Sequence, residues 1–298
     1  DKVKKYELDK ANGLKHEAMG ITVTEYAAKW LPIHRHSSNA KSYSTYAMML
    51  ERFSQRCGNS KRLRDITKSD IKDFYNSLEG YSFSYIQKYT QTISAMFRDA
   101  VEDGIILHSP CHDVAAPEGT KGTHRPLEPW ERELVHQMAE EHRFGIAAML
   151  MLYGGLRRGE AIAFNIDRDV DFEAGRIYVR EAISFSGGIR GAIKSPKTDA
   201  GIRSVPLFEP LRSVLEGKHG LAISSASGEP MTLSALDRVW ESYVYNIEEK
   251  MNGFQRRWAN GREWKHFTVR THDFRHSFCT MICDAGVDIK TAMKWMGH

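Results

Sequence analysis

Residues 107–129 interrupt the helical patterning of the chain, and this interruption constrains the fold more than any other feature. The segment holds four prolines and two glycines, which leave no room for a helix of useful length. Apolar residues recur at helical spacing on both sides of it, and 298 residues are enough for two ordinary cores. We therefore predict a tether (1–20), a helical domain (21–108), a linker (109–126) and a second domain (127–298).

The segment before the interruption predicts a small all-α domain of four helices. Thr22 and Glu25 have the Ser/Thr-x-x-Glu spacing of a capping box, which starts a helix. Apolar stripes at helical spacing also follow Ser38, Thr67 and Ser84. The aromatic residues of these stripes are interpreted as core rather than as platforms on which bases stack.

The second domain is predicted to be mostly helical with a small antiparallel sheet, which makes the fold class α+β. A strongly apolar helix, 144–153, runs into a pair of glycines that allows a tight turn. Segments 176–182 and 202–207 alternate as strands do. Lys197 is expected on or near the turn of the last hairpin.

Basic residues are concentrated in two segments, although the net charge of +4 is only mildly basic. Residues 41–73 carry eight Lys or Arg against four acids, and residues 250–275 carry seven against two. Two separated basic segments are what a protein that grips a polyanion needs, whereas a solvated surface is the plainer alternative. The candidates for contacts to nucleic-acid phosphates are Lys41, Arg52, Arg56, Lys61, Arg62, Arg64, Arg256, Arg257, Lys265 and Arg270.

The composition also argues against several classes of protein. No apolar run reaches the length of a membrane span, and no signal-peptide pattern is found at the N-terminus. The four cysteines lack the spacing of a disulfide framework, which fits a reducing cytosol. We therefore expect a cytoplasmic protein with no membrane partner.

Several basic residues occur in short motifs that carry more weight together than singly. Arg157 follows two glycines and stands three residues before Glu160, which could hold its guanidinium in place. His272 and Arg275 form a His-x-x-Arg motif, and the chain closes with a Gly-His pair that ends in His298. Each residue alone is a weak signal, because a lone Arg or His is more often structural than catalytic.

The order of these motifs resembles that of the tyrosine recombinase (phage integrase) family. Its members carry Thr-Gly-Leu-Arg-x-x-Glu, a hairpin Lys, His-x-x-Arg and Leu-Gly-His in this order. The chain has Gly-Gly-Leu-Arg-x-x-Glu, Lys-Thr before an Arg-x-x-Pro-Leu strand, His-x-x-Arg and Met-Gly-His. The resemblance covers residues 20–298, since the helical domain with its Thr-x-x-Glu-Tyr-Ala opening also looks like the core-binding domain of the family.

The resemblance implies a site that transfers a DNA phosphodiester to a tyrosine, without a metal or other cofactor. Arg157 and Arg275 would hold the phosphoryl oxygens bidentately, and Glu160 would support Arg157. Lys197 would be the general acid to the leaving 5′ oxygen. His272 would hydrogen-bond the phosphate or help to move the proton of the nucleophile, and His298 would contact a non-bridging oxygen. Lys194 is the rival general acid, although Lys197 followed by Thr198 matches the family better.

The nucleophile of the family is a tyrosine about nine residues beyond the Gly-His motif, which is about two to three helical turns on. No residue follows His298 in this chain, and its tyrosines match no nucleophile motif. We therefore expect these 298 residues to assemble the phosphate-binding site without cleaving DNA. A nicked or suicide DNA substrate should then give no covalent adduct.

The function implied is that of an integrase of a prophage or conjugative transposon, which acts on the bacterial nucleoid. It would cleave and rejoin double-stranded DNA at core-type sites through a 3′-phosphotyrosyl intermediate, as a tetramer on the DNA. A type IB topoisomerase, which relaxes supercoils as a monomer, is one alternative. A DNA-binding regulator that kept the fold but lost catalysis is another.

A competing metal site deserves comparison, because His272, His276, Cys279 and Cys283 share one face of a predicted helix. A single straight helix offers two neighbouring ligands to one ion rather than four in a tetrahedron. We therefore predict no metal site there. Cys279 and Cys283 are interpreted as small buried apolar residues.

Overall fold

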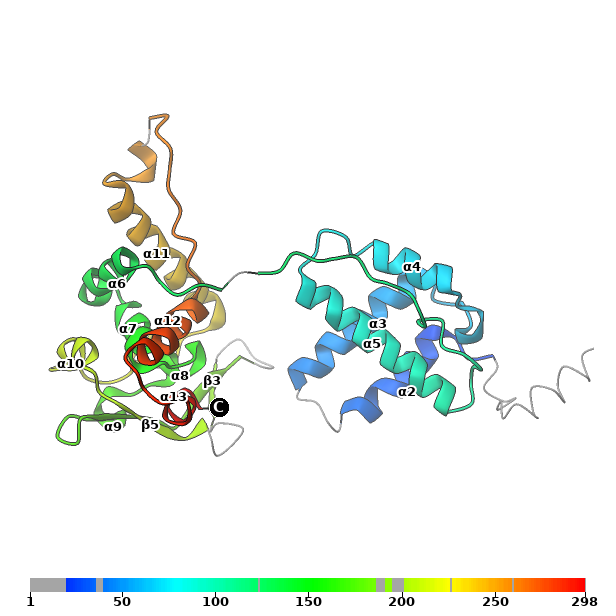
Figure 1. Ribbon diagram of the computed structural model, residues 1–298, viewed down its shortest axis with the longest axis horizontal. Helices are drawn as coiled ribbons and strands as arrows, with labels where there is room; N and C mark the ends of the chain where they lie inside the picture. The colour runs from blue at the N-terminus through cyan, green and yellow to red at the C-terminus, as the bar shows by residue number, and fades with distance from the viewer. Residues whose placement is uncertain are drawn as a thin grey trace, which may run out of the picture. The chain divides into compact units, whose positions relative to one another are not determined.

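The computed structural model describes most of the chain, and its described residues form two compact units. The described residues are 20–35, 40–122, 124–185, 191–194, 201–225, 227–258 and 260–297. The first unit falls within residues 1–123 and the second unit within residues 124–298 (Figure 1). Two residues singled out by the sequence, Lys197 and His298, lie outside the described residues.

The described elements of the first unit are helical, as predicted. They are α2 (Val23–Arg35), α3 (Ala40–Cys57), α4 (Lys68–Asn76) and α5 (Phe83–Glu102), with a 3₁₀ turn η2 (Leu63–Asp65). The predicted capping box forms, because the Thr22 and Glu25 backbone amides each donate to the other's side chain, at 2.9 and 3.2 Å. A second box, between Thr67 and Asp70, starts α4.

The core of the first unit extends beyond α5 into the segment rich in proline. Ile105 and Ile106 are buried, and Cys111, Val114 and Ala116 pack against the same core. The two compact units divide between residues 123 and 124. Half of the interrupted stretch thus belongs to the first unit by packing, although it forms no long helix.

The second unit is built around α7 (Gly145–Gly154), in which eight of ten residues are buried. Such a helix has no polar face, so α6 and α12 cover it on two sides (Figure 1). The other helices are α6 (Pro129–Glu141), α8 (Arg158–Ala163), α9 (Ile166–Asp169), α10 (Glu209–Leu215), α11 (Leu233–Asn252), α12 (Thr271–Asp284) and α13 (Ile289–Met296), with a 3₁₀ turn η4 (Arg256–Trp258).

The described strands form two small antiparallel sheets rather than the single predicted one. They are β1 (Val170–Asp171), β2 (Arg176–Val179), β3 (Ala182–Ser184), β4 (Ala192–Lys194) and β5 (Arg203–Pro206), ordered β1-β2-β5 in one sheet and β3-β4 in the other. The predicted last hairpin is therefore wrong, because β4 pairs with β3 and β5 pairs with β2. Burial explains the difference: β5 places Val205 in the core opposite Ile177, whereas all of β4 is exposed.

A basic arm, residues 245–266, projects from the body of the second unit. It consists of the last turns of α11 and the chain that returns beside them (Figure 1). Glu248 joins the two halves, since its carboxylate accepts from the Trp264 indole at 2.8 Å and from the Phe267 amide at 2.9 Å. Trp264 also stacks on Tyr245 at 6.2 Å between ring centres.

Candidate active site

The candidate site begins where α7 ends. Gly155 follows this helix with φ of 64°, a left-handed conformation that glycine adopts without strain. A Cβ on Gly155 would lie 2.4 Å from the Phe278 ring, so the turn also needs the missing side chain. The turn sets Arg157 at the start of α8. There its amide donates to the Glu160 carboxylate at 2.7 Å, and its Nη1 donates to the same carboxylate at 2.9 Å.

Arg203 of β5 is the second partner of Glu160. No role was predicted for Arg203 from the sequence. Its two Nη atoms donate to the two carboxylate oxygens at 3.0 and 2.7 Å, which makes a bidentate pair. Both side chains are buried, with 2% and 4% exposed. Burial alone would raise the pKa of Glu160, but the hydrogen bonds and charge of Arg203 outweigh it and lower that pKa. In the sequence, Arg203 could have been found as the arginine of the Arg-x-x-Pro-Leu motif.

Helix α12 brings Arg275 to the same carboxylate, with Nη1 4.0 Å from Glu160. Only 3% of its side chain is exposed, and its guanidinium donates to the carbonyls of Gly155 and Met296. Burial first, and then the charges of two neighbouring arginines, lower the pKa of Arg275 to about 10. The group therefore stays charged at neutral pH.

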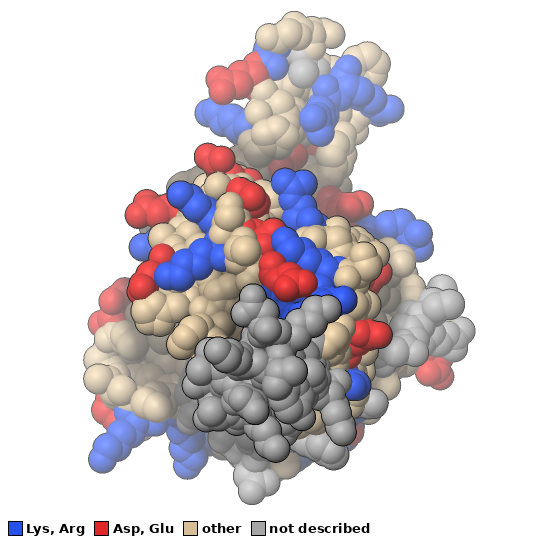
Figure 2. Space-filling view, turned by 90° about the vertical axis from the view of Figure 1, so that its right-hand side faces the viewer, with Lys and Arg blue, Asp and Glu red and all other residues tan. Residues whose placement is uncertain are grey.

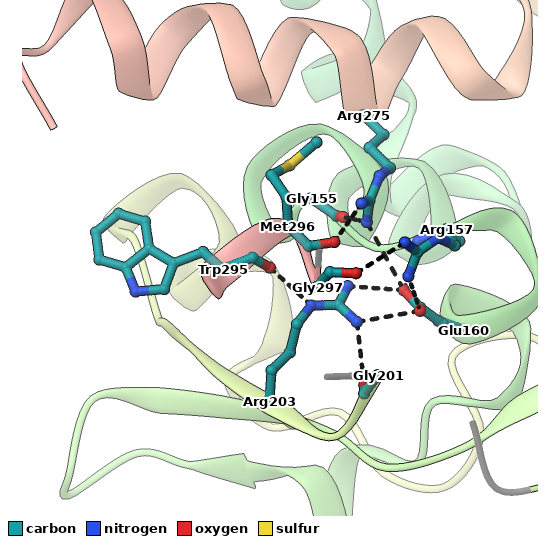
Figure 3. Close-up of polar contacts among 9 residues, drawn as sticks. All are labelled: Gly155, Arg157, Glu160, Gly201, Arg203, Arg275, Trp295, Met296 and Gly297. Carbon is teal, nitrogen blue, oxygen red and sulfur yellow. Dashed lines mark hydrogen bonds and ion pairs between the residues drawn. The ribbon is translucent and has the colours of Figure 1, made fainter. Parts of the chain in front are cut away.

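The last turn of α13 is held by these three arginines through consecutive backbone carbonyls (Figure 3). The pairs are Arg203 Nε with Trp295 O at 2.7 Å, Arg157 Nη2 with Gly297 O at 3.1 Å, and Arg275 with Met296 O. The final carbonyls of a helix lack donors within the helix and carry the negative end of its dipole. Cationic donors therefore satisfy them well, and α13 is fixed against the site.

We call Arg157, Arg203 and Arg275 around Glu160 the arginine cluster. It carries three positive charges against one negative charge, before any helix dipole is counted. Arg157 is the member that solvent reaches, with 42% of its side chain exposed. Guanidinium groups in fixed positions with an excess of charge are suited to bind an oxyanion such as a phosphate.

His272, at the start of α12, is exposed, and its ring meets that of His124 edge to face at 5.9 Å. His124 in turn lies 2.7 Å from Asp273, measured from Nδ1 to the carboxylate. The pKa of His272 is lowered, first by partial desolvation and then by the charge of Arg275. A neutral imidazole can accept or pass a proton at pH 7. No sequence motif had singled out His124.

The structure thus brings Arg157, Glu160 and Arg275 together. Two other predicted residues of the site lie outside the described part of the chain. Lys197 and His298 are not described, so their roles stay predictions. The rival general acid, Lys194, is exposed at the end of β4.

Most of the candidate phosphate-contacting residues are exposed. In the first unit these are Arg56, Arg62 and Arg64, and in the second unit they are Arg256, Arg257, Lys265 and Arg270. Lys61 is paired with Asp70 at 2.7 Å, Arg52 lies against tyrosine rings, and the side chain of Lys41 is not described. Acidic side chains are interspersed among Lys and Arg on the face shown in Figure 2, so charge alone outlines no binding surface there.

Helix α12 carries the four side chains of the competing metal proposal. The described part of the chain contains no group of three or more His, Cys, Asp or Glu that could hold a metal ion. Cys279 is partly buried, but the prediction of burial is wrong for Cys283, which is exposed because Phe278 and Ile282 carry the buried face. Among the described helices, none is both long and apolar enough to cross a membrane.

Known proteins resemble this chain along most of its length. A model of the phage integrase family matches residues 131–298, and one of the phage integrase SAM-like domain matches residues 21–115. The transposase from transposon Tn916 of Enterococcus faecalis is 23% identical over 250 residues, which cover 80% of this chain and 62% of that protein. The ICEBs1 integrase of Bacillus subtilis (strain 168) is 24% identical over 247 residues, which cover 79% of this chain and 64% of that protein. The chain thus spans less than two thirds of the length of these relatives.

Solved structures share its fold at low sequence identity. The Tn1549 transposon integrase in complex with a circular intermediate DNA gives a TM-score of 0.74 at 23% identity, covering 93% of this chain and 92% of that chain. A lambda integrase tetramer bound to a Holliday junction gives 0.65 at 19% identity, covering 94% and 78%. These likenesses establish the fold, and the family model matches more than half of the sequence. The chain belongs to the phage integrase, or tyrosine recombinase, family.

Proposed function

We propose that this chain is the DNA-binding and strand-transferring part of a site-specific recombinase of a mobile genetic element. It would cleave and rejoin double-stranded DNA through a 3′-phosphotyrosyl intermediate. The observation that carries the proposal is the arginine cluster, in which Arg157 and Arg275 share the buried carboxylate of Glu160. The relatives named as a transposase and an integrase of mobile elements support the same function.

The chemistry follows from the positive charge of the cluster. Attack on a phosphodiester builds negative charge on the non-bridging oxygens, and cations already in position stabilise that charge without reorganising. Arg157 and Arg275 would bind these oxygens. Glu160 and Arg203 would touch no reacting atom, because their polar groups pair with each other. Their part is to keep the guanidinium of Arg157 in one orientation.

Proton transfer would fall to residues around the cluster. His272, neutral at pH 7 because its pKa is lowered, would hydrogen-bond the phosphate or help to move the proton of the tyrosine nucleophile. Lys197 would protonate the leaving 5′ oxygen, and His298 would contact a non-bridging oxygen. The roles of Lys197 and His298 rest on the sequence motifs alone.

Arg275 would have to exchange partners when DNA binds. Its side chain is 3% exposed, and its donors face the Gly155 and Met296 carbonyls. A phosphate oxygen would therefore reach Arg275 only if the last turn of α13 shifted. The Met296 carbonyl would then lose its charged donor, and the phosphate would take the place of that carbonyl as the acceptor for Arg275.

The partners proposed are core-type recombination sites in duplex DNA and further copies of this chain. The lambda integrase structure is a tetramer bound to a Holliday junction, which supports assembly of four chains on DNA. Action on the DNA of a bacterial mobile element would place the protein with the nucleoid.

The experiment is a titration of duplex DNA at several salt concentrations with the 298-residue protein, Arg157→Ala and Arg212→Ala. Arg212 pairs with Glu216 at 3.2 Å on α10 and controls for the loss of one positive charge elsewhere. We expect Arg157→Ala to weaken binding by about tenfold and to lower the salt slope by about one unit, because one phosphate contact is lost. Arg212→Ala should match the wild type. No duplex binding, or equal losses in both variants, would overturn the proposal.

The stoichiometry of the complex separates the alternatives. A recombinase requires four chains that bridge two duplexes, and light scattering measures the mass of such a complex. One chain on one duplex would instead indicate a topoisomerase. A regulator that has lost catalysis would bind DNA as tightly after Arg157→Ala as before it.

A further inference from the structure

Arg52, in the second half of α3, lies against three tyrosines, of which Tyr81 precedes α5 and Tyr85 and Tyr89 lie in its first turns. Its guanidinium carbon is 5.2 Å from the ring centre of Tyr81 and 5.8 Å from that of Tyr89, and Nη1 donates to the Tyr85 hydroxyl at 3.3 Å. Tyr81 and Tyr85 stack, with ring centres 4.8 Å apart and an interplanar angle of 19°. These contacts limit the orientations of the Arg52 side chain.

The tyrosine platform, which is Tyr81, Tyr85 and Tyr89, runs from the core of the first unit to its surface. Tyr89 is fully buried, whereas Tyr81 is 41% exposed. A returning segment braces the platform, since the Thr120 amide donates to the Tyr81 carbonyl at 3.2 Å. Gly119 permits this approach, because a Cβ there would lie 2.4 Å from the backbone nitrogen of Phe83.

A neighbouring pair extends the same surface. Phe83 is 43% exposed, and the Lys121 ammonium lies 5.5 Å from its ring centre. Large aromatic side chains at the surface, accompanied by cations, are typical of a binding surface rather than of a solvated one. Tyr81 and Phe83 precede the apolar stripe that follows Ser84, so the prediction that the aromatic residues of the stripes are core does not cover them.

The geometry favours recognition of a base over contact with a phosphate. A phosphate contact needs a positive charge, and a flexible Lys or Arg supplies it. A base edge needs the plane of the guanidinium fixed, so that two parallel N–H groups meet two acceptors. Rings that hold the guanidinium also reduce the side-chain entropy lost on binding, which for Arg is up to about 2 kcal/mol.

Other basic side chains of the first unit differ from Arg52. Lys61 is paired with Asp70 at 2.7 Å, and Arg64 lies 3.8 Å from Asp65. Arg52 forms no ion pair with a carboxylate among the residues that the structure describes. Arg56, one turn further along α3, is exposed. Of these four side chains, Arg52 is the one that aromatic contacts orient.

We propose that Arg52 recognises a guanine in the major groove through bidentate hydrogen bonds to O6 and N7, and so determines part of the target sequence. This inference rests on the proposed function, because it names a base within the DNA that the chain is proposed to bind. The tyrosine platform is the positioning device, and Lys121 supplies charge next to it.

The test is a selection of binding sites from a random duplex library by the 298-residue protein, Arg52→Lys and Arg56→Lys. Lysine keeps the charge but loses the two-pronged donor, so Arg52→Lys separates base recognition from phosphate contact. We expect a guanine preference at one position of the wild-type motif to fall by about tenfold in Arg52→Lys, with the other positions unchanged. Arg56→Lys should retain the full motif.

A second variant tests the platform and does not depend on Arg52 itself. Tyr81→Leu leaves the guanidinium intact but removes one exposed ring, and we expect the same guanine preference to weaken by about threefold. Circular dichroism of each variant checks that the first unit remains folded.

Several outcomes would overturn the inference. An Arg52→Lys motif identical to that of the wild type would do so, as would a uniform loss of affinity at every position. If the wild type bound DNA without any sequence preference, base recognition by Arg52 would be disproved, whereas the proposal of DNA binding would stand. A wild-type protein that binds no DNA would remove the proposed function as well.

Discussion

The two units hold their arginines in opposite ways. In the second unit, Arg203 and Arg275 are buried, and their donors face one carboxylate and the backbone carbonyls of α13. In the first unit, Arg52 rests on tyrosine rings and Arg56 is exposed. Buried charges with fixed partners are screened little by salt, whereas exposed charges are screened strongly. The second unit thus fixes its arginines through buried polar partners, whereas the first unit orients Arg52 through aromatic rings and leaves Arg56 to solvent.

The largest expected effect concerns stability. Arg203→Met leaves Glu160 buried without its bidentate partner, and we expect the free energy of unfolding of the second unit to fall by about 3–5 kcal/mol. Arg56→Met, on the exposed surface, should change it by less than about 0.5 kcal/mol. Chemical denaturation followed by tryptophan fluorescence measures this, because five of the six tryptophans lie in residues 124–298.

A conservative variant sharpens that result. Arg203→Lys should recover only part of the stability, because lysine cannot make the bidentate pair. A loss of less than about 1 kcal/mol in Arg203→Met would mean that the buried pair is not a distinctive feature of the second unit.

The next effect concerns the last turn of α13. If phosphate replaces the Met296 carbonyl at Arg275, DNA binding removes a charge-assisted hydrogen bond that contributes about 1.5–3 kcal/mol. Hydrogen exchange of the α13 amides should then become about tenfold faster with DNA. The amides of the buried helix α7 serve as the internal control. Slower exchange in α13 on DNA binding would show that the helix and the phosphate share the cluster instead of competing for it.

The smallest effect concerns pH. The pKa of His272 is lowered in the DNA-free protein, so its ring is neutral at pH 7. A bound phosphate would raise that pKa, so binding would take up a proton and the affinity would rise as pH falls. We expect a gain of about threefold between about pH 8 and pH 6. His272→Gln should remove this gain, and His276→Gln should keep it.

No such pH term is expected from the first unit, where the DNA contacts proposed are Lys and Arg side chains that keep their charge over this range. An equal pH dependence in wild type and His272→Gln would show that His272 does not contact the phosphate.

The helices and the local part of the site could be predicted from the sequence. The capping box of Thr22 and Glu25 formed, because it depends on residues three apart. The pairing of Arg157 with Glu160 formed for the same reason. The motifs also indicated the family, since their order survives at low identity. Such short-range contacts are encoded in spacing.

What only the tertiary structure decided lies between residues far apart in the chain. The role of Arg203 depends on β5 pairing with β2, which places its guanidinium against a carboxylate 43 residues away. The burial of Arg275 depends on the last turn of α13, and the orientation of Arg52 depends on α5. The sequence shows where each arginine stands in the chain, but packing decides whether its guanidinium is buried, paired with a carboxylate or exposed to a ligand.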